Sequence, residues 1–193
     1  MSTRAKQIGL LGLSLLIVVG FLFLPKQPAS VLENATPVGE VDIEIEKAVQ
    51  QIQMGSNPME GILALRAISE ENPENVDAQL WLGVFSMQSG QMDKAKDRFT
   101  RVLTLEENNS VAHGYLGEMS MRDSLFGQAI GHFELAYAND TSYHNGLFFI
   151  AKSYEELGDA ENAIKYYGEY LPFAPDTTVS SRVNQFIDQL RNK

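Results

Sequence analysis

Histidine is the residue type in this chain best suited to bind a metal or to carry a proton near neutral pH, and there are three: His113, His132 and His144. None lies three or four residues from another, the spacing that places two ligands on one helix face. The sequence also has no His-Glu-x-x-His arrangement. We therefore expect ordinary helical or turn histidines and no metal site.

Adjacent carboxylates could supply acid and base chemistry, and three Glu pairs occur, at residues 70–71, 106–107 and 155–156. Neighbouring residues on a helix point about 100° apart, so such pairs do not face a common substrate. There is no Cys, no phosphate-binding glycine-rich loop and no Ser or Thr in a nucleophile motif. The sequence thus predicts solvated acidic faces at these pairs, and no enzyme activity, catalytic residue or cofactor.

The charge balance argues against one class of partner. The 193 residues include 15 Lys and Arg against 25 Asp and Glu, which gives a net charge of −10. This is the wrong sign for a surface that must hold phosphate backbones. We expect no nucleic acid partner.

Residues 8–24 carry no charge and would span roughly 26 Å as a helix, enough for one membrane crossing. Arg4 and Lys6 precede this stretch, and the positive-inside rule then keeps residues 1–7 in the cytoplasm. Prolines mark residues 25–41 as a semi-rigid linker. We expect a single-pass anchor in the inner (cytoplasmic) membrane, with the rest of the chain in the periplasm. A cleaved signal peptide is the alternative.

A 34-residue repeat organises the remainder of the chain. Residues 76–109, 110–143 and 144–177 align without gaps, and 42–75 form a degenerate first unit. Each full unit has an apolar-small pair, then a small residue, then a large aromatic residue: Leu82-Gly83, Ala95 and Phe99; Leu116-Gly117, Ala129 and Phe133; Ile150-Ala151, Ala163 and Tyr167.

These spacings predict two helices in each unit. The small residues let the two helices lie close together. Gly90 and Gly158 fall where the first helix must turn into the second. Ser124 takes this position in the middle unit, where we expect a looser turn. Residues 178–193 have one apolar face and are expected to form a capping helix.

The pattern resembles the tetratricopeptide repeat (TPR) family, through Leu82-Gly83, Ala95 with Phe99, and Ala163 with Tyr167 and Pro175. The resemblance implies an all-α, helix-turn-helix solenoid that winds as a superhelix around a concave groove. Carried over position by position, it places these groove candidates for binding a peptide: Leu80, Val84, Met87, Glu118, Met121, Arg122, Phe148 and Lys152.

Together these features predict a non-catalytic, membrane-anchored adaptor or scaffold that binds a peptide segment or protein partner in its groove. The chain resembles inner-membrane TPR proteins that are associated with the Sec translocon or with cytochrome c assembly, which implies a part in protein export or assembly. A scaffold that self-associates through its exposed end units into a homo-oligomer is the alternative from another class, with residues 41–54 as either that contact or an N-terminal cap.

Overall fold

The computed structural model describes residues 39–55 and 58–192, and this part of the chain is all-helical, without strands. The elements are α2 (Glu40–Met54), α3 (Pro58–Glu71), α4 (Val76–Gln88), α5 (Met92–Leu105), α6 (Ser110–Arg122), α7 (Phe126–Asn139), α8 (Asn145–Glu156), α9 (Ala160–Tyr170), the short 3₁₀ helix η2 (Leu171–Phe173) and α10 (Thr177–Arg191).

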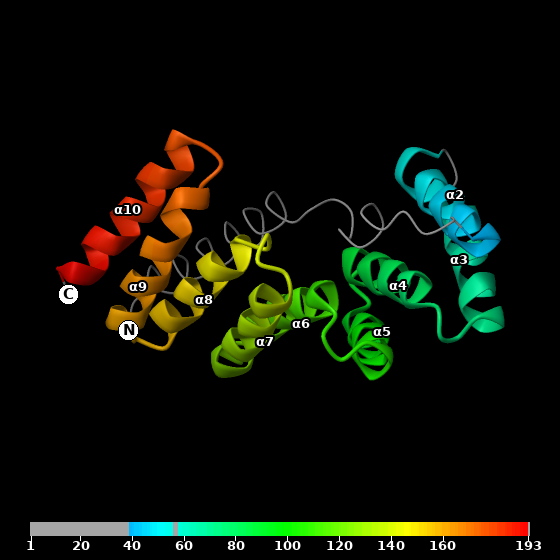
Figure 1. Ribbon diagram of the computed structural model, residues 1–193, viewed down its shortest axis with the longest axis horizontal. Helices are drawn as coiled ribbons and strands as arrows, with labels where there is room; N and C mark the ends of the chain where they lie inside the picture. The colour runs from blue at the N-terminus through cyan, green and yellow to red at the C-terminus, as the bar shows by residue number, and fades with distance from the viewer. Residues whose placement is uncertain (1–38, 56–57, 193) are drawn as a thin grey trace, which may run out of the picture.

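Consecutive helices pack as hairpins, α2 with α3, α4 with α5, α6 with α7 and α8 with α9. The hairpins follow one another in a row, from α2 and α3 at one end to α10 at the other (Figure 1). Each hairpin contacts the next, so the architecture is a solenoid in which contacts are made mainly between neighbours in sequence.

Side-chain caps start several of these helices. The Oδ1 atoms of Asn75, Asn109 and Asp176 accept the backbone N–H groups three residues on, at 2.8, 3.0 and 2.9 Å. Asp159 caps α9 in the same way. Because the first N–H groups of a helix have no partner within it, these caps set where each helix begins.

The turns inside the hairpins use left-handed backbone. Gly90 and Gly158 have φ values of 76° and 78°, and Ser124 has a φ of 61°. The hydrogen bonds around Ser124, including its N–H to Met121 O at 3.0 Å, repeat those around Gly90. The prediction of a looser turn at Ser124 was therefore wrong, because the hairpin geometry imposes the same turn on a residue with a Cβ atom.

Small residues bring the two helices of a hairpin together, as the repeat predicted. A Cβ atom built on Gly83 would lie 2.6 Å from Cε1 of Phe99, and one on Gly117 would lie 2.7 Å from Cε1 of Phe133. Both phenylalanine rings are fully buried and stack on an aromatic ring of the next helix. The aromatic residues thus join each unit to its neighbour.

The predicted membrane anchor, residues 8–24, and the cytoplasmic segment 1–7 lie outside the described residues. So does the linker 25–41 except for its last three residues, of which two already belong to α2. Within residues 39–55 and 58–192, no helix has both the length and the apolar character that a membrane crossing requires.

Candidate functional site

The predicted groove residues lie on the first helices of three hairpins, and we call the surface of α4, α6 and α8 the first-helix face. The three from α4, Leu80, Val84 and Met87, are buried at 0%, 7% and 8% exposure. They belong to the apolar core that runs from α2 to α6. These three side chains therefore pack inside the core, and their contact with a ligand stays a prediction.

The candidates on α6 and α8 are more varied. Met121 and Phe148 are half-buried and pack at the edge of the apolar cluster between α7 and α8, while Arg122 is exposed. This part of the first-helix face therefore presents both apolar and cationic groups, and a ligand would find its accessible contacts here rather than on α4.

Two polar atoms beside them are buried and unpaired. Neither Oε1 of Glu118 nor the hydroxyl of Tyr143 has a hydrogen-bond partner among the described residues. Tyr143 comes from the connection between α7 and α8, and its hydroxyl lies 3.2 Å from a Cβ atom built on Gly114 of α6. Buried polar groups are normally hydrogen-bonded, so these two unpaired atoms are an exception within the described residues.

Burial also controls the ionisation of this cluster. It raises the pKa of the Glu118 carboxyl to about 8, and the Arg122 cation nearby opposes the shift. Burial, followed by the Glu118 charge, raises the pKa of both Tyr115 and Tyr143. At pH 7 Glu118 is therefore mostly protonated and can both donate and accept a hydrogen bond.

Sequence reasoning identified Glu118 but missed Tyr143. Tyr143 is the last residue of its repeat unit, outside the positions that carry the groove in the resemblance. The available signal was its place in the connection before α8, next to glycines that leave room for its ring: its Cδ1 is 3.0 Å from a Cβ atom built on Gly146.

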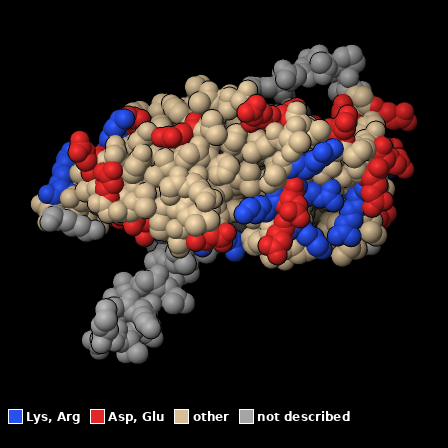
Figure 2. Space-filling view, turned by 90° about the horizontal axis from the view of Figure 1, so that it is seen from below, with Lys and Arg blue, Asp and Glu red and all other residues tan. Residues whose placement is uncertain are grey.

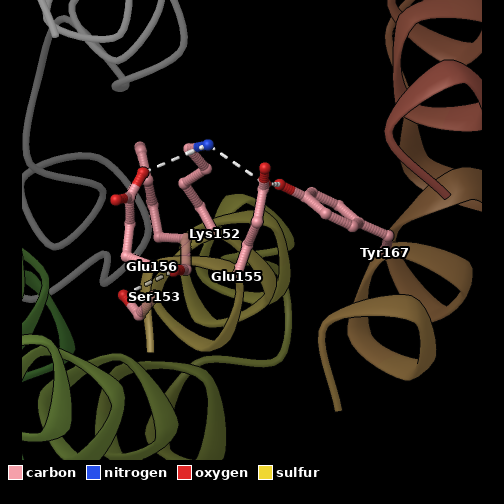
Figure 3. Close-up of polar contacts among 6 residues, drawn as sticks. Lys152, Ser153, Glu155, Glu156 and Tyr167 are labelled. Carbon is pink, nitrogen blue, oxygen red and sulfur yellow. Dashed lines mark hydrogen bonds and ion pairs between the residues drawn. The ribbon is translucent and has the colours of Figure 1, made fainter. Parts of the chain in front are cut away.

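Lys152 is held by acidic neighbours of the same helix. Its Nζ atom lies 3.0 Å from Oε2 of Glu155 and 3.4 Å from Oε1 of Glu156, and the Tyr167 hydroxyl of α9 donates to the same Glu155 oxygen at 2.8 Å (Figure 3). Lys152 is buried, and its charge is already compensated. The hydrogen bond between Tyr167 and Glu155 joins α9 to α8, and ligand contact by Lys152 stays a prediction.

This network corrects one expectation. The pair at residues 155–156 was predicted to be a solvated acidic face, but the Glu155 side chain is only 19% exposed and accepts hydrogen bonds from Lys152 and Tyr167. Burial, followed by Glu155, raises the pKa of the Tyr167 hydroxyl. The prediction was wrong for Glu155 because α9 packs over one side of α8 and leaves Glu156 on the more open side.

Two histidines that lie far apart in sequence meet between α6 and α7. The Nε2–H of His113 donates to the Glu107 carbonyl at 3.0 Å, so its Nδ1 atom is left to accept the Nδ1–H of His132 at 3.1 Å. Burial, then His113 and Lys96, lowers the pKa of His132. The ring of His144 instead stacks on that of Phe173, with 3.6 Å between the ring centroids. The spacing of 19 residues hid the contact between His113 and His132.

The described residues hold no group of three or more His, Cys, Asp or Glu side chains that could bind a metal ion. The polar groups of the first-helix face are instead hydrogen-bonding and charged groups suited to reversible contact with another molecule.

Comparisons with known proteins identify the repeat. Family models described as tetratricopeptide repeat match residues 58–118 and 144–177. A search of the curated proteins found no match.

Solved structures share the fold. The chain is 19% identical to the crystal structure of MamA protein, with a TM-score of 0.63 over 79% of this chain and 86% of that one. The chain is 14% identical to MamA from Desulfovibrio magneticus RS-1, with a TM-score of 0.63 over 80% of this chain and 96% of that one. The chain is 18% identical to PilF from Pseudomonas aeruginosa, with a TM-score of 0.64 over 78% of this chain and 67% of that one. This chain therefore carries tetratricopeptide repeats within residues 58–177, in an all-helical solenoid fold.

Proposed function

We propose that this chain is a non-catalytic adaptor that binds a peptide segment or protein partner on its first-helix face. The observation that carries this is the partly exposed apolar surface of Met121 and Phe148 together with the exposed guanidinium of Arg122. Such a combination offers a partner both hydrogen bonds and apolar contact, and methionine adapts to varied ligand shapes.

The adaptor is anchored in the inner membrane by residues 8–24, with the repeats on the periplasmic side. The uncharged stretch and the basic residues that precede it support this part of the proposal. An anchored repeat domain of this kind would assist protein export or assembly at the membrane, including cytochrome c assembly, by holding a client close to the membrane.

Photocrosslinking of the full chain in its native membrane tests the proposal. A photoreactive residue in place of Met121 is expected to capture a discrete heterologous protein. The same residue in place of Leu135, which is 46% exposed on α7, serves as the control and should not capture it. Equal labelling from both positions would contradict binding at the first-helix face, and mass spectrometry identifies the adducts.

A self-associating scaffold is the second candidate, and one observation favours it. The first hairpin exposes Ile43, Met59 and Leu63, each more than half exposed, near one end of the solenoid. Exposed apolar residues at the end of a repeat array can pack on a second copy. Self-adducts from a photoreactive residue in place of Leu63, together with a mass that increases with concentration and no heterologous adduct from Met121, would support this function in place of the adaptor.

A further inference from the structure

A second hollow lies on the α3 and α5 side of α4. A cleft of about 600 Å³ runs between α3 and α5, with Leu82 and Phe85 of α4 among its lining residues. Four cationic side chains also line it, together with two acidic ones: Arg66, Lys94, Arg98, Arg101, Glu70 and Asp97. Figure 2 shows Lys and Arg gathered on this side of the molecule, with Asp and Glu side chains between and beside them.

None of these cations forms an ion pair within the described part of the chain. The ion pairs found there involve Lys152, Lys165 and Arg191, and none includes a cation of the cleft. Like charges close together repel, and the protein as a whole is acidic, with a net charge of −10. Four cations against two carboxylates leave the cleft with a local excess of positive charge, which favours an anionic ligand.

Arg98 is held in place by a buried polar network. Its Nη1 atom donates to Gln79 Oε1 at 2.6 Å and to Ser69 Oγ at 3.0 Å. Gln79, which is 4% exposed, also donates from Nε2 to Ser69 Oγ and to the Pro73 carbonyl. The guanidinium is thus oriented before any ligand arrives, which reduces the entropy lost on binding.

The free edge of this guanidinium can bind a carboxylate. A guanidinium has five N–H donors, and Nη1 carries only two of them. Neither Nε nor Nη2 of Arg98 has a hydrogen-bond partner in the described residues. The three remaining donors suit the fork-like contact that arginine makes with carboxylates.

The spacing of the cations indicates the shape of the ligand. Lys94, Arg98 and Arg101 recur at intervals of four and three residues, so they lie along one face of α5 over about 10 Å. A single phosphate group would need donors that converge on one point. Cations spread along a cleft beside apolar side chains instead match a peptide with several carboxylates along its length.

We propose that the cleft between α3 and α5 binds a carboxylate-rich peptide segment of a partner protein. The cleft lies on the α3 and α5 side of α4, whereas Met121 and Phe148 lie on α6 and α8, so the two surfaces can be tested separately.

Fluorescence anisotropy with a labelled octaglutamate peptide tests the proposal, using the full chain in a non-ionic detergent. Octaglutamate should bind saturably and more weakly as salt is added, and octalysine should not bind. Changing the exposed pair Arg66→Gln and Arg101→Gln together should weaken binding at least about tenfold. Arg182→Gln, an exposed cation on α10, is the matched control and should leave the affinity unchanged.

A gain of affinity provides a test that misfolding cannot imitate. Glu70→Gln with Asp97→Asn removes the two carboxylates that line the cleft, and octaglutamate should then bind severalfold more tightly.

The proposal is overturned if the double arginine variant binds like Arg182→Gln, or if the two acidic substitutions do not tighten binding. It is also overturned if inorganic phosphate displaces the peptide as well as free triglutamate does at equal ionic strength, which would indicate a phosphate site. Crosslinking from Met121 should be unchanged in the arginine variant, so the two proposals can fail independently.

Discussion

At the scale of single residues, the most informative feature is the partly buried carboxyl of Glu118. Its Oε1 atom has no hydrogen-bond partner within the described residues, and Arg122 one turn further along α6 forms no ion pair with it there. An unsatisfied buried group lowers the stability of the protein. Such a cost is common at binding sites, where a ligand later supplies the missing contact.

The ionisation of Glu118 should make stability depend on pH. Its folded-state pKa of about 8 lies above the ordinary 4.5, so the unfolded state releases this proton first as pH rises. The stabilisation is full below pH 4.5 and is lost as pH rises through about 8. Glu118→Gln cannot ionise and should therefore be more stable than the wild type at pH 7, by on the order of 3 kcal/mol.

Urea unfolding followed by circular dichroism at a series of pH values measures this difference. The gap between wild type and Glu118→Gln should widen from pH 4.5 towards pH 8. Glu46→Gln, an exposed position on α2, is the control and should show no such gap. Parallel curves for wild type and Glu118→Gln would show that the carboxyl is not buried as described.

At the scale of helices, the hairpins depend on close approach between a glycine of the first helix and a ring of the second. Gly83 faces Phe99, and Gly117 faces Phe133, at distances that leave no room for a methyl group. The rings are fully buried and cannot move aside without disturbing the next unit, on which they stack. Helix pairing and the joining of units are therefore coupled through the same residues.

Two glycine substitutions should have opposite effects. Gly83→Ala should destabilise the protein by about 1–3 kcal/mol because the new methyl group overlaps the Phe99 ring. Gly131→Ala in α7 meets no atom within 4 Å and should stabilise it by about 0.5–1 kcal/mol, since alanine favours a helix. Denaturant unfolding measures both, and a similar loss of stability in both variants would contradict the packing account.

At the scale of the whole molecule, the core is divided along the row of helices. One apolar cluster runs from α2 to α6, a second lies between α7 and α8, and a third joins α8, α9 and α10. Contacts are made mainly between neighbouring units, as in other solenoids. A local loss of packing should therefore affect its own end of the molecule first.

Val183→Asp tests this prediction at the C-terminal end. Val183 is 1% exposed in the third cluster, and an aspartate there would place a carboxylate against apolar side chains. Hydrogen–deuterium exchange should become faster in α8, α9 and α10 and stay unchanged in α4 and α5. Ser181→Asp, on the exposed side of α10, is the control. Faster exchange along the whole row would mean that the solenoid opens as one unit.

The sequence by itself predicted the repeat period, the all-helical solenoid and the close contacts at Gly83 and Gly117, and the family models and structural comparisons confirm the repeats and the fold. These features were accessible because they depend on local rules that recur every 34 residues. Spacing reveals which residues share a helix face, and a small residue at a repeated position reveals where helices approach closely.

Only the tertiary structure decided which polar groups meet. His113 bonds His132 across 19 residues, Arg98 bonds Ser69 across 29, and Tyr143 lies against α6 from the connection after α7. It also showed that Leu80 is fully buried in the core, whereas groove contact by Leu80 stays a prediction. The physical reason is that these contacts depend on how neighbouring units are rotated and how far each side chain reaches, which no spacing within a single helix specifies.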